Sequence, residues 1–201
     1  YGKFEVDWYK QKGVEEDYLE KIGHPRFDQI FLRKQTSKSN FEKKLGLDPK
    51  KKTILIGVRA EQNIDKWRKF IQILKKEDNF NIIVRDFPDV KNHKLIQEFP
   101  NLFTCKNFHL YDVIHNVDAV VVYSSTIALE AMLAGKPVFI LNNQFPGYTG
   151  YFDSLGEVVQ EHPLKLAIKL NEYFIDKTFQ EEVNNMRTKF LSNAYPNSHE
   201  M

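Results

Sequence analysis

Three hydroxyl residues stand between an apolar run and a helical pattern in the middle of the chain. Ser124, Ser125 and Thr126 follow the residues Val120 to Val122, and a segment rich in small residues comes next. Free backbone N–H groups and the positive end of the helix dipole favour an anion at such a helix start. Serine and threonine are also ordinary helix caps. The pattern therefore predicts either a phosphate site or a simple cap.

Glu130 stands one helical turn after Thr126, on the same face of the predicted helix. A carboxylate at that position would lie just beyond the hydroxyl groups, within reach of a ribose diol. The alternative is a solvated glutamate on the surface of the helix. Ligands of open α/β sheets bind at the carboxyl ends of the strands. A role of Glu130 in ligand binding therefore stands as an alternative to a solvated surface position.

The elements that must position these residues alternate along the chain. Short apolar runs, typical of buried parallel strands, are separated by segments with helical spacing of apolar residues. The predicted strands are Thr53–Val58, Phe80–Arg85, Leu102–Cys105, Asp118–Tyr123, Pro137–Leu141 and a short one at Val158–Val159. The predicted helices are Ile64–Lys76, Val90–Phe99, Leu110–Val117, one that ends before Gly135, Pro163–Phe174 and Thr178–Leu191. This alternation predicts an α/β fold with a doubly wound parallel sheet.

Length and composition limit the classes of protein. The chain of 201 residues has room for one domain of ordinary size, with or without an appendage. Its net charge of +2 gives no electrostatic footprint for nucleic acid or for an anionic membrane. No apolar run is long enough to span a bilayer, and no signal peptide is visible. The single cysteine, Cys105, excludes an internal disulfide and is expected in the core, which fits a reducing compartment.

Several patterns are missing or incomplete. His109 and His115 lack the spacing and the third partner of a metal site, so we expect no metal. The pair Gly135-Lys136 is not a phosphate-binding P-loop, because Pro137 stands where that motif needs a hydroxyl residue. Ser125 lacks the flanking glycines of a nucleophile elbow, which argues against a hydrolase.

A series of short motifs follows in a characteristic order. They are Gly13-Val14, Gly23–Asp28, Thr53–Gly57, Tyr123–Thr126, Glu130 and Gly135–Pro137. This order resembles the carboxyl-terminal half of GT-B fold transferases over nearly the whole chain. The resemblance is to CDP-glycerol glycerophosphotransferase-like and surface-polysaccharide enzymes, with the non-hydrolysing UDP-N-acetylglucosamine 2-epimerases as structural cousins.

The resemblance implies a division of the chain into three parts. Residues 1–50 would be the interdomain linker and a remnant of the amino-terminal domain, residues 51–191 a Rossmann-like nucleotide-binding domain, and residues 192–201 a polar tail. The amino-terminal acceptor domain, which supplies the catalytic base in such enzymes, would be missing. Any peripheral contact with a membrane would also come through that missing part.

The resemblance also implies roles for residues around the donor. Ser124, Ser125 and Thr126 would bind the diphosphate and Glu130 the ribose. Gly57 would let a phosphate approach closely, a tight turn being the alternative, and Arg59 would supply a counter-charge. The remaining positions implied are Phe108, His109 and Leu110 beside the base, Asn142, Asn143 and Gln144 beside the transferred group, and His24 and Arg26 in the hinge. For the three polar residues after Leu141, simple loop polarity is the slightly favoured alternative.

The implied reaction is transfer of a glycosyl or polyol-phosphate group from a UDP- or CDP-linked donor to an acceptor hydroxyl in surface polysaccharide biosynthesis. No cofactor is implied, and the expected place is the cytoplasm, including the inner face of the membrane. Phe87 stands where glycerophosphotransferase relatives usually carry a histidine, which argues against a polyol-phosphate donor. Taken alone, the chain is expected to be inactive. The alternatives are a UDP-N-acetylglucosamine 2-epimerase-like fragment and a non-catalytic interaction module.

Overall fold

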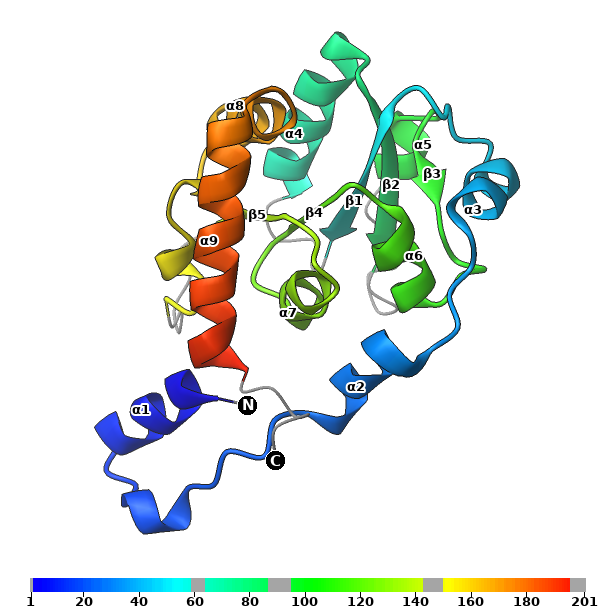
Figure 1. Cartoon of the computed structure of the whole chain (residues 1–201). Helices are drawn as coiled ribbons and strands as arrows, with labels where there is room; N and C mark the ends of the chain where they lie inside the picture. Colours follow the sequence, from blue (N-terminus) through cyan, green and yellow to red (C-terminus); the bar gives the residue numbers. More distant parts are fainter. Residues whose placement is uncertain (1, 59–63, 87–94, 143–149, 196–201) are drawn as a thin grey trace.

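The computed structural model describes residues 2–58, 64–86, 95–142 and 150–195. Within these ranges the centre of the molecule is a six-stranded parallel sheet with the order β3-β2-β1-β4-β5-β6 (Figure 1). The strands are β1 Lys52–Val58, β2 Phe80–Asp86, β3 Phe103–Thr104, β4 Ala119–Val122, β5 Val138–Leu141 and β6 Val159–Gln160. The α/β fold with a doubly wound parallel sheet is therefore confirmed.

Helices precede, connect and follow the strands. They are α1 Lys3–Gln11, α2 Pro25–Leu32, α3 Lys38–Leu45, α4 Ile64–Glu77, α5 Leu95–Glu98, α6 Leu110–Asn116, α7 Thr126–Leu133, α8 Pro163–Ile175 and α9 Lys177–Ala194, with short 3-10 segments η1 Glu16–Tyr18 and η2 Asp153–Val158. Helices α4 and α8 pack against each other, as do α6 and α7. Helix α9 runs along the side of the domain, where it contacts α7, α8 and α1 (Figure 1).

The strand order reverses between β1 and β4. The chain builds outward from β1 through β2 to β3, then returns across the sheet to place β4 on the other side of β1. The two strands are paired in register, with Gly57 opposite Val122. In open α/β sheets a crevice forms at such a point, outside the carboxyl ends of the two strands. The Ser124–Thr126 turn begins directly after this pair.

Most predicted elements are confirmed to within one or two residues, because their apolar patterns coincide with burial. Helix α4 is an example: Trp67, Phe70, Ile71 and Leu74 recur at helical spacing, and all four are buried. Helix α7 ends near Gly135, whose φ of 77° is the left-handed conformation that favours glycine after a helix. Of the predicted helix Val90–Phe99, residues 95–98 are helical, while residues 90–94 lie outside the described ranges.

The first fifty residues are more structured than their mixed composition predicts. Helices α2 and α3 place Phe27, Ile30 and Phe41 in the core cluster of the sheet domain. Helix α1 instead lies against the end of α9, and together with η1 it projects from the body of the domain (Figure 1). At its start, a Cβ on Gly2 would come within 2.6 Å of the backbone of Ala194. Part of the expected linker is thus packed on the domain, and the domain boundaries remain predictions.

The carboxyl-terminal end is also longer than expected. Helix α9 continues to Ala194, into the segment that we expected to be a polar tail, and both Ala194 and Tyr195 are buried. The hydroxyl of Tyr195 donates a hydrogen bond of 3.2 Å to the carbonyl oxygen of His24. This contact joins the end of α9 to the start of α2. Residues 196–201 lie outside the described part of the chain.

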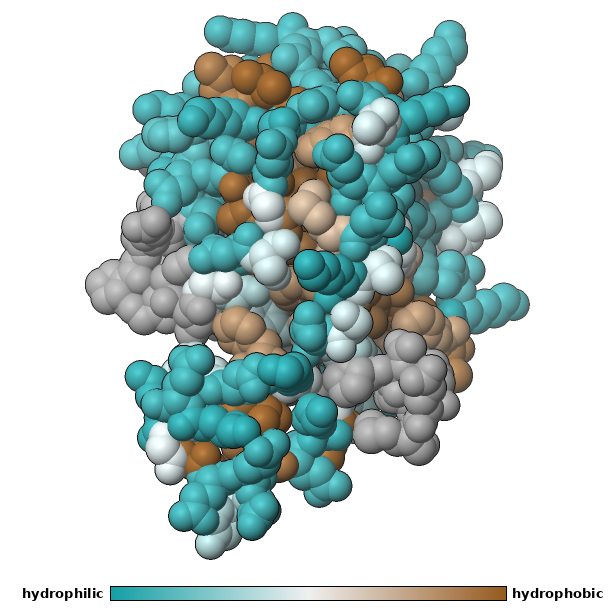
Figure 2. All heavy atoms as spheres, turned by 60° about the vertical axis from the view of Figure 1, so that its left-hand side comes forward, coloured by the Kyte–Doolittle hydropathy of each residue, from teal (hydrophilic) through white to brown (hydrophobic). Residues whose placement is uncertain are grey.

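The surface around α8 and α9 is largely hydrophilic, with apolar atoms visible at the end where α8 lies and also lower on the same face (Figure 2). Leu164, Ile168 and Ile175 of α8 are exposed and share one face of that helix. Among the helices that the structure describes, none is both long and apolar enough to cross a bilayer.

We predict that helix α2 contributes to the stability of the whole domain. Ile30 is 1% exposed whereas Leu32, on the same helix, is 78% exposed. Ile30→Ala should therefore lower the free energy of unfolding by about 2 to 5 kcal/mol, through lost burial and a cavity. Leu32→Ala, the matched control, should change it by less than about 0.5 kcal/mol. Urea denaturation of both variants measures this, and equal effects would show that α2 is only a linker.

Candidate functional site

The turn at the carboxyl end of β4 carries the three hydroxyl residues. Ser124 and Ser125 are partly buried and Thr126, the first residue of α7, is exposed. Oγ of Ser125 accepts a hydrogen bond of 3.3 Å from the backbone N–H of Ile127, so this serine is the cap of α7. The capping role expected for this turn is therefore present in Ser125, and its phosphate-binding role remains a prediction.

Gly57 lies beside this turn, and its lack of a side chain has a structural cause. A Cβ there would come within 2.9 Å of Cγ1 of Val122 and 3.7 Å of Cδ1 of Ile127. Val122 is buried in the sheet, so it has little room to move away. The glycine thus allows β4 and the first turn of α7 to pack close to β1. Close approach of a phosphate remains a separate prediction, and Arg59 lies outside the described residues.

Glu130 is fully buried, which makes the expected alternative of a solvated surface glutamate wrong. Its Oε1 atom accepts a hydrogen bond of 2.9 Å from Arg26 of α2. The hydroxyl of Tyr111, on α6, lies 3.1 Å from the same oxygen and 3.1 Å from the carbonyl oxygen of Arg26. One carboxylate therefore joins three helices that are far apart in sequence.

Burial dominates the ionisation of this group. It raises the pKa of Glu130, while the charge of Arg26 and the hydrogen bonds from Tyr111 and Arg26 act in the opposite direction. Burial also raises the pKa of the Tyr111 hydroxyl. The pKa of the Arg26 guanidinium is raised in turn, first by Tyr111 and then by the nearby carboxylate. The arrangement is an ion pair in which the Glu130 side chain is buried and the Arg26 side chain reaches solvent.

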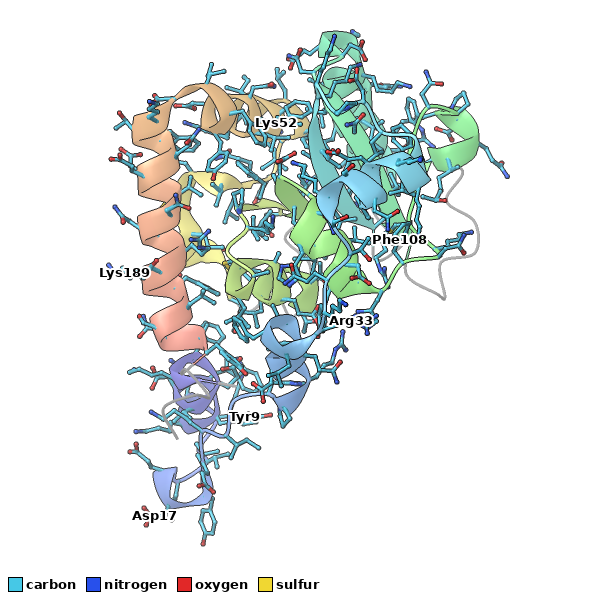
Figure 3. The ribbon with its side chains drawn as sticks, turned by 45° about the vertical axis from the view of Figure 1, so that its right-hand side comes forward. Tyr9, Asp17, Arg33, Lys52, Phe108 and Lys189 are labelled. Atoms are coloured by element: carbon cyan, nitrogen blue, oxygen red, sulfur yellow. The ribbon has the colours of Figure 1, made fainter. Side chains whose placement is uncertain are left out.

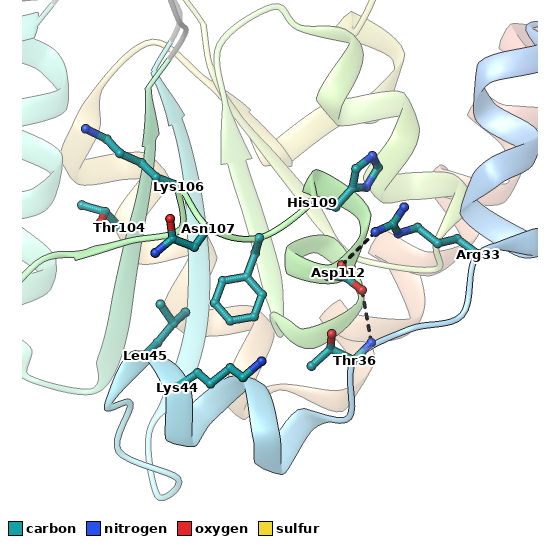
Figure 4. A pocket seen from close by; sticks show the side chains of 10 residues that line it. Arg33, Thr36, Lys44, Leu45, Thr104, Lys106, Asn107, His109 and Asp112 are labelled. Carbon is teal, nitrogen blue, oxygen red and sulfur yellow. Dashed lines mark hydrogen bonds and ion pairs between the residues drawn. The ribbon is translucent and has the colours of Figure 1, made fainter.

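A pocket of about 460 Å³ opens beside α6, between the loop after β3 and the chain that joins α2 to α3 (Figure 4). Arg33 and Phe108, which both line it, lie on the same side of the molecule (Figure 3). The complete lining is Arg33, Thr36, Lys44, Leu45, Thr104, Lys106, Asn107, Phe108, His109 and Asp112. Of the three residues predicted beside a base, Phe108 and His109 line this pocket, whereas Leu110 is buried in the core.

Asp112 fixes one wall of the pocket. Its carboxylate accepts a hydrogen bond of 3.1 Å from the backbone N–H of Thr36 and lies 3.6 Å from the guanidinium of Arg33. Asn116, one turn further along α6, donates to the carbonyl oxygens of Thr36 at 3.0 Å and of Asp112 at 2.7 Å. Two buried polar residues at positions i and i+4 of a short helix, Asp112 and Asn116, were the available sequence signal for this wall.

His109 lines the pocket and also caps the start of α6. Its Nδ1 atom accepts a hydrogen bond of 3.2 Å from the backbone N–H of Tyr111. Burial lowers the pKa of His109, and the nearby charge of Arg33 lowers it further. The ring is accordingly held as a neutral acceptor. His24 stacks on Phe27 with ring centroids 4.5 Å apart, at the start of α2.

The residues predicted beside the transferred group are only partly described. Asn142 is buried directly after β5, where its backbone N–H donates to the carbonyl oxygen of Gln160 at 2.7 Å. Lys66 donates to the carbonyl oxygen of Asn142 at 3.4 Å. Asn143 and Gln144 lie outside the described ranges. Within those ranges, no group of three or more His, Cys, Asp or Glu residues is arranged to hold a metal ion.

A family model and a curated protein, both compared with this chain by sequence, agree with each other. The lipid-A-disaccharide synthetase family model matches residues 3–144. A lipid-A-disaccharide synthase from Syntrophotalea carbinolica is 24% identical over 152 residues, which cover 71% of this chain and 38% of that protein. The chain thus spans well under half the length of this curated relative.

Solved structures with the same fold are more distant in sequence. The wall teichoic acid polymerase TagF matches with a TM-score of 0.66 at 17% identity, over 99% of this chain and 54% of the polymerase. A UDP-GlcNAc 2-epimerase from Neisseria meningitidis, solved with UDP-GlcNAc bound, matches with a TM-score of 0.67 at 14% identity, over 93% of this chain and 58% of the epimerase. These likenesses confirm the Rossmann-like fold of GT-B structures. The finer assignment to CDP-glycerol enzymes remains a prediction.

We predict that Glu130 makes the stability of the domain depend on pH. Because its pKa is raised in the folded state, its contribution to stability is fully present below the ordinary value near 4.5 and is lost as pH rises through the raised pKa. The variant Glu130→Gln cannot ionise. Relative to it, the wild-type protein should lose stability as pH rises from 4 to 8, with a slope of at most about 1.4 kcal/mol per pH unit.

Urea denaturation of both proteins across this pH range measures the difference. A difference between the two that stays constant with pH would contradict the prediction, because it would mean that Glu130 titrates equally in the folded and unfolded states.

Proposed function

Because the chain belongs to the lipid-A-disaccharide synthetase family, we propose that it is the nucleotide-sugar-binding half of a GT-B glycosyltransferase. The observation that carries this proposal is the placement of the hydroxyl turn at the point where the strand order reverses. There Thr126 opens α7 beside Gly57, at the carboxyl ends of two paired parallel strands. A helix start at this position favours the diphosphate of an activated donor.

The proposed ligand extends from this turn toward α6. The diphosphate lies at Ser124–Thr126, the ribose reaches toward Glu130, and the base lies near Phe108 and His109. Phe108 offers an aromatic side chain, and the pocket beside it is large enough for a nucleoside fragment. Arg59, Asn143 and Gln144 are proposed near the phosphate and the transferred group from the resemblance of the sequence alone.

The chain's own contribution to the reaction would be electrostatic. When the donor bond breaks, negative charge develops on the leaving nucleoside diphosphate. The start of α7 and its hydroxyl groups would stabilise that charge without any change of their own position, which lowers the barrier to transfer. The acceptor hydroxyl and the base that removes its proton would come from the other half of the enzyme, so this chain alone would bind the donor without turnover.

The family match favours a glycosyl group over a polyol phosphate as the group transferred. The family model and the curated relative both carry the name of a disaccharide synthase, and Phe87 stands where a polyol-phosphate enzyme usually has histidine. The fold likeness to the epimerase keeps a related isomerase as the second candidate. The two differ in what the bound donor undergoes, not in the nucleotide site proposed here. A role in surface polysaccharide synthesis is part of the same proposal.

We predict that a nucleoside diphosphate binds at the start of α7. Calorimetric titration with UDP, CDP, GDP and ADP should show selective binding of one base. Thr126→Ala should weaken that binding about tenfold, since it removes a hydrogen bond to a charged phosphate. Alanine is a good helix former, so the fold should be unaffected.

The matched control is Thr178→Ala. Thr178 is also an exposed threonine in the first turn of a helix, α9, which begins beside α8. It should leave the affinity unchanged. Absence of binding to all four diphosphates, or equal weakening by both substitutions, would overturn the proposed function and favour an interaction module.

A further inference from the structure

Helix α8 carries large apolar side chains on its solvent-facing side. Leu164, Ile168 and Ile175 are 57%, 54% and 83% exposed. The opposite face of the same helix is buried against the domain through Leu166 and Leu170. Single exposed apolar residues need no explanation, whereas a contiguous group of them on one helix face indicates an interaction surface. Apolar atoms are visible at this end of the molecule in Figure 2.

The exposed residues have the spacing of a surface on which a second helix packs. Positions on this face recur at intervals of four, three and four residues, which is the repeat of paired helices. They are Leu164, Ile168, Asn171 and Ile175, and we call them the α8 stripe. The side-chain amide of Asn171 donates to Glu77 of α4 at 2.7 Å and to the carbonyl oxygen of Ala167 at 3.0 Å. Both amide hydrogens are thus satisfied within the chain, so another helix can cover Asn171 without a loss of these bonds.

Two residues of opposite charge flank the α8 stripe along one edge. Lys165 and Glu172 each follow a member of the stripe, and their separation of seven residues places them on the same side of the helix. When two copies of such a helix pair in antiparallel order, residues of this edge lie opposite each other across the two-fold axis. Lys165 of each copy then faces Glu172 of the other. The edge is therefore complementary in charge to a copy of itself.

We infer that the α8 stripe binds a second copy of this chain, and that the two α8 helices pair in antiparallel order across a two-fold axis. Leu164 of each copy would then pack on Ile175 of the other, with the two Ile168 side chains near the centre. Figure 1 shows α8 at the opposite end of the molecule from α2, so this dimer would leave the surface around α2 uncovered. The inference is independent of the proposed function.

The charges beside the α8 stripe favour a protein partner over a lipid surface. A helix that lies on an anionic membrane carries mainly Lys and Arg beside its apolar face. Here Lys165 and Glu172 cancel, and Glu161 stands three residues before Leu164. The contact is also small, because one pair of 13-residue helices buries less than the roughly 1,200 Å² of a stable interface. We therefore expect a weak dimer, with a dissociation constant between about 10 μM and 1 mM.

Analytical ultracentrifugation of the full chain, from about 10 μM to about 1 mM, measures the association. The average mass of the wild-type protein should rise with concentration toward twice that of the monomer. Ile168→Glu should keep the protein monomeric, since it places two like charges near the centre of the contact. Leu32→Glu is the matched control, because it changes an exposed apolar residue on α2 and should leave the association unchanged. Thermal melting checks that each variant is folded.

A charge exchange tests the antiparallel pairing. Lys165→Glu and Glu172→Lys should each weaken the dimer about tenfold, because each change makes two attractive pairs repulsive. The double variant that carries both changes exchanges the charges in both copies, so it should associate within about threefold of the wild-type protein. A residue that only supports its own helix would not be rescued in this way.

Each contrary outcome overturns the inference. A wild-type protein that stays monomeric at about 1 mM has no such contact. Equal association of the wild-type protein and Ile168→Glu would place the contact elsewhere, and failure of the double variant to recover would exclude the antiparallel pairing. Binding of a monomeric protein to phosphatidylcholine–phosphatidylglycerol vesicles, lost in Ile168→Glu, would make lipid the occupant of the α8 stripe instead.

Discussion

The close pairing of β1 with β4 is the constraint on which the candidate site depends. The two strands are neighbours because the chain, after adding β2 and β3 on one side of β1, crosses over and adds β4 on its other side. Gly57 leaves room for Val122 and for Ile127 of the following helix, so α7 sits directly on the end of the pair. The hydroxyl turn, the start of α7 and the buried Glu130 all take their positions from that contact.

Local sequence patterns predicted these strands and helices well, because their apolar residues recur with the period of the element and are the residues that are buried. Strands covered on both faces are apolar throughout, and helices such as α4 bury one stripe, so both are recognisable within a short window. Glycine and proline after α7 marked its end for a similarly local reason. The placement of Glu130 on the face that carries Thr126 also followed from helix geometry alone.

The remainder depends on contacts between distant parts of the chain. Nothing near Glu130 in sequence indicates that Arg26 is its partner, since the two residues are 104 positions apart. The packing of α2 and α3 on the sheet domain was missed for the same reason. The few apolar residues of these helices are buried by contacts with elements that come later in the chain, which a short sequence window does not include. The pocket beside α6 likewise joins a loop, a helix and a connecting segment, and of its lining only Phe108 and His109 were expected near a ligand, from the resemblance of the sequence.

The pocket beside α6 has a consequence for the rate at which the proposed ligand would arrive. Three basic residues, Arg33, Lys44 and Lys106, line this pocket with one acidic residue, Asp112, in a protein whose overall charge is close to balanced. The positive potential is therefore local, and it is concentrated in a concave surface where field lines converge. An anion diffusing nearby would be drawn toward this side of the sheet before any specific contact forms. Such steering weakens as added salt shortens the distance over which charges act, so encounter would be fastest in dilute buffer.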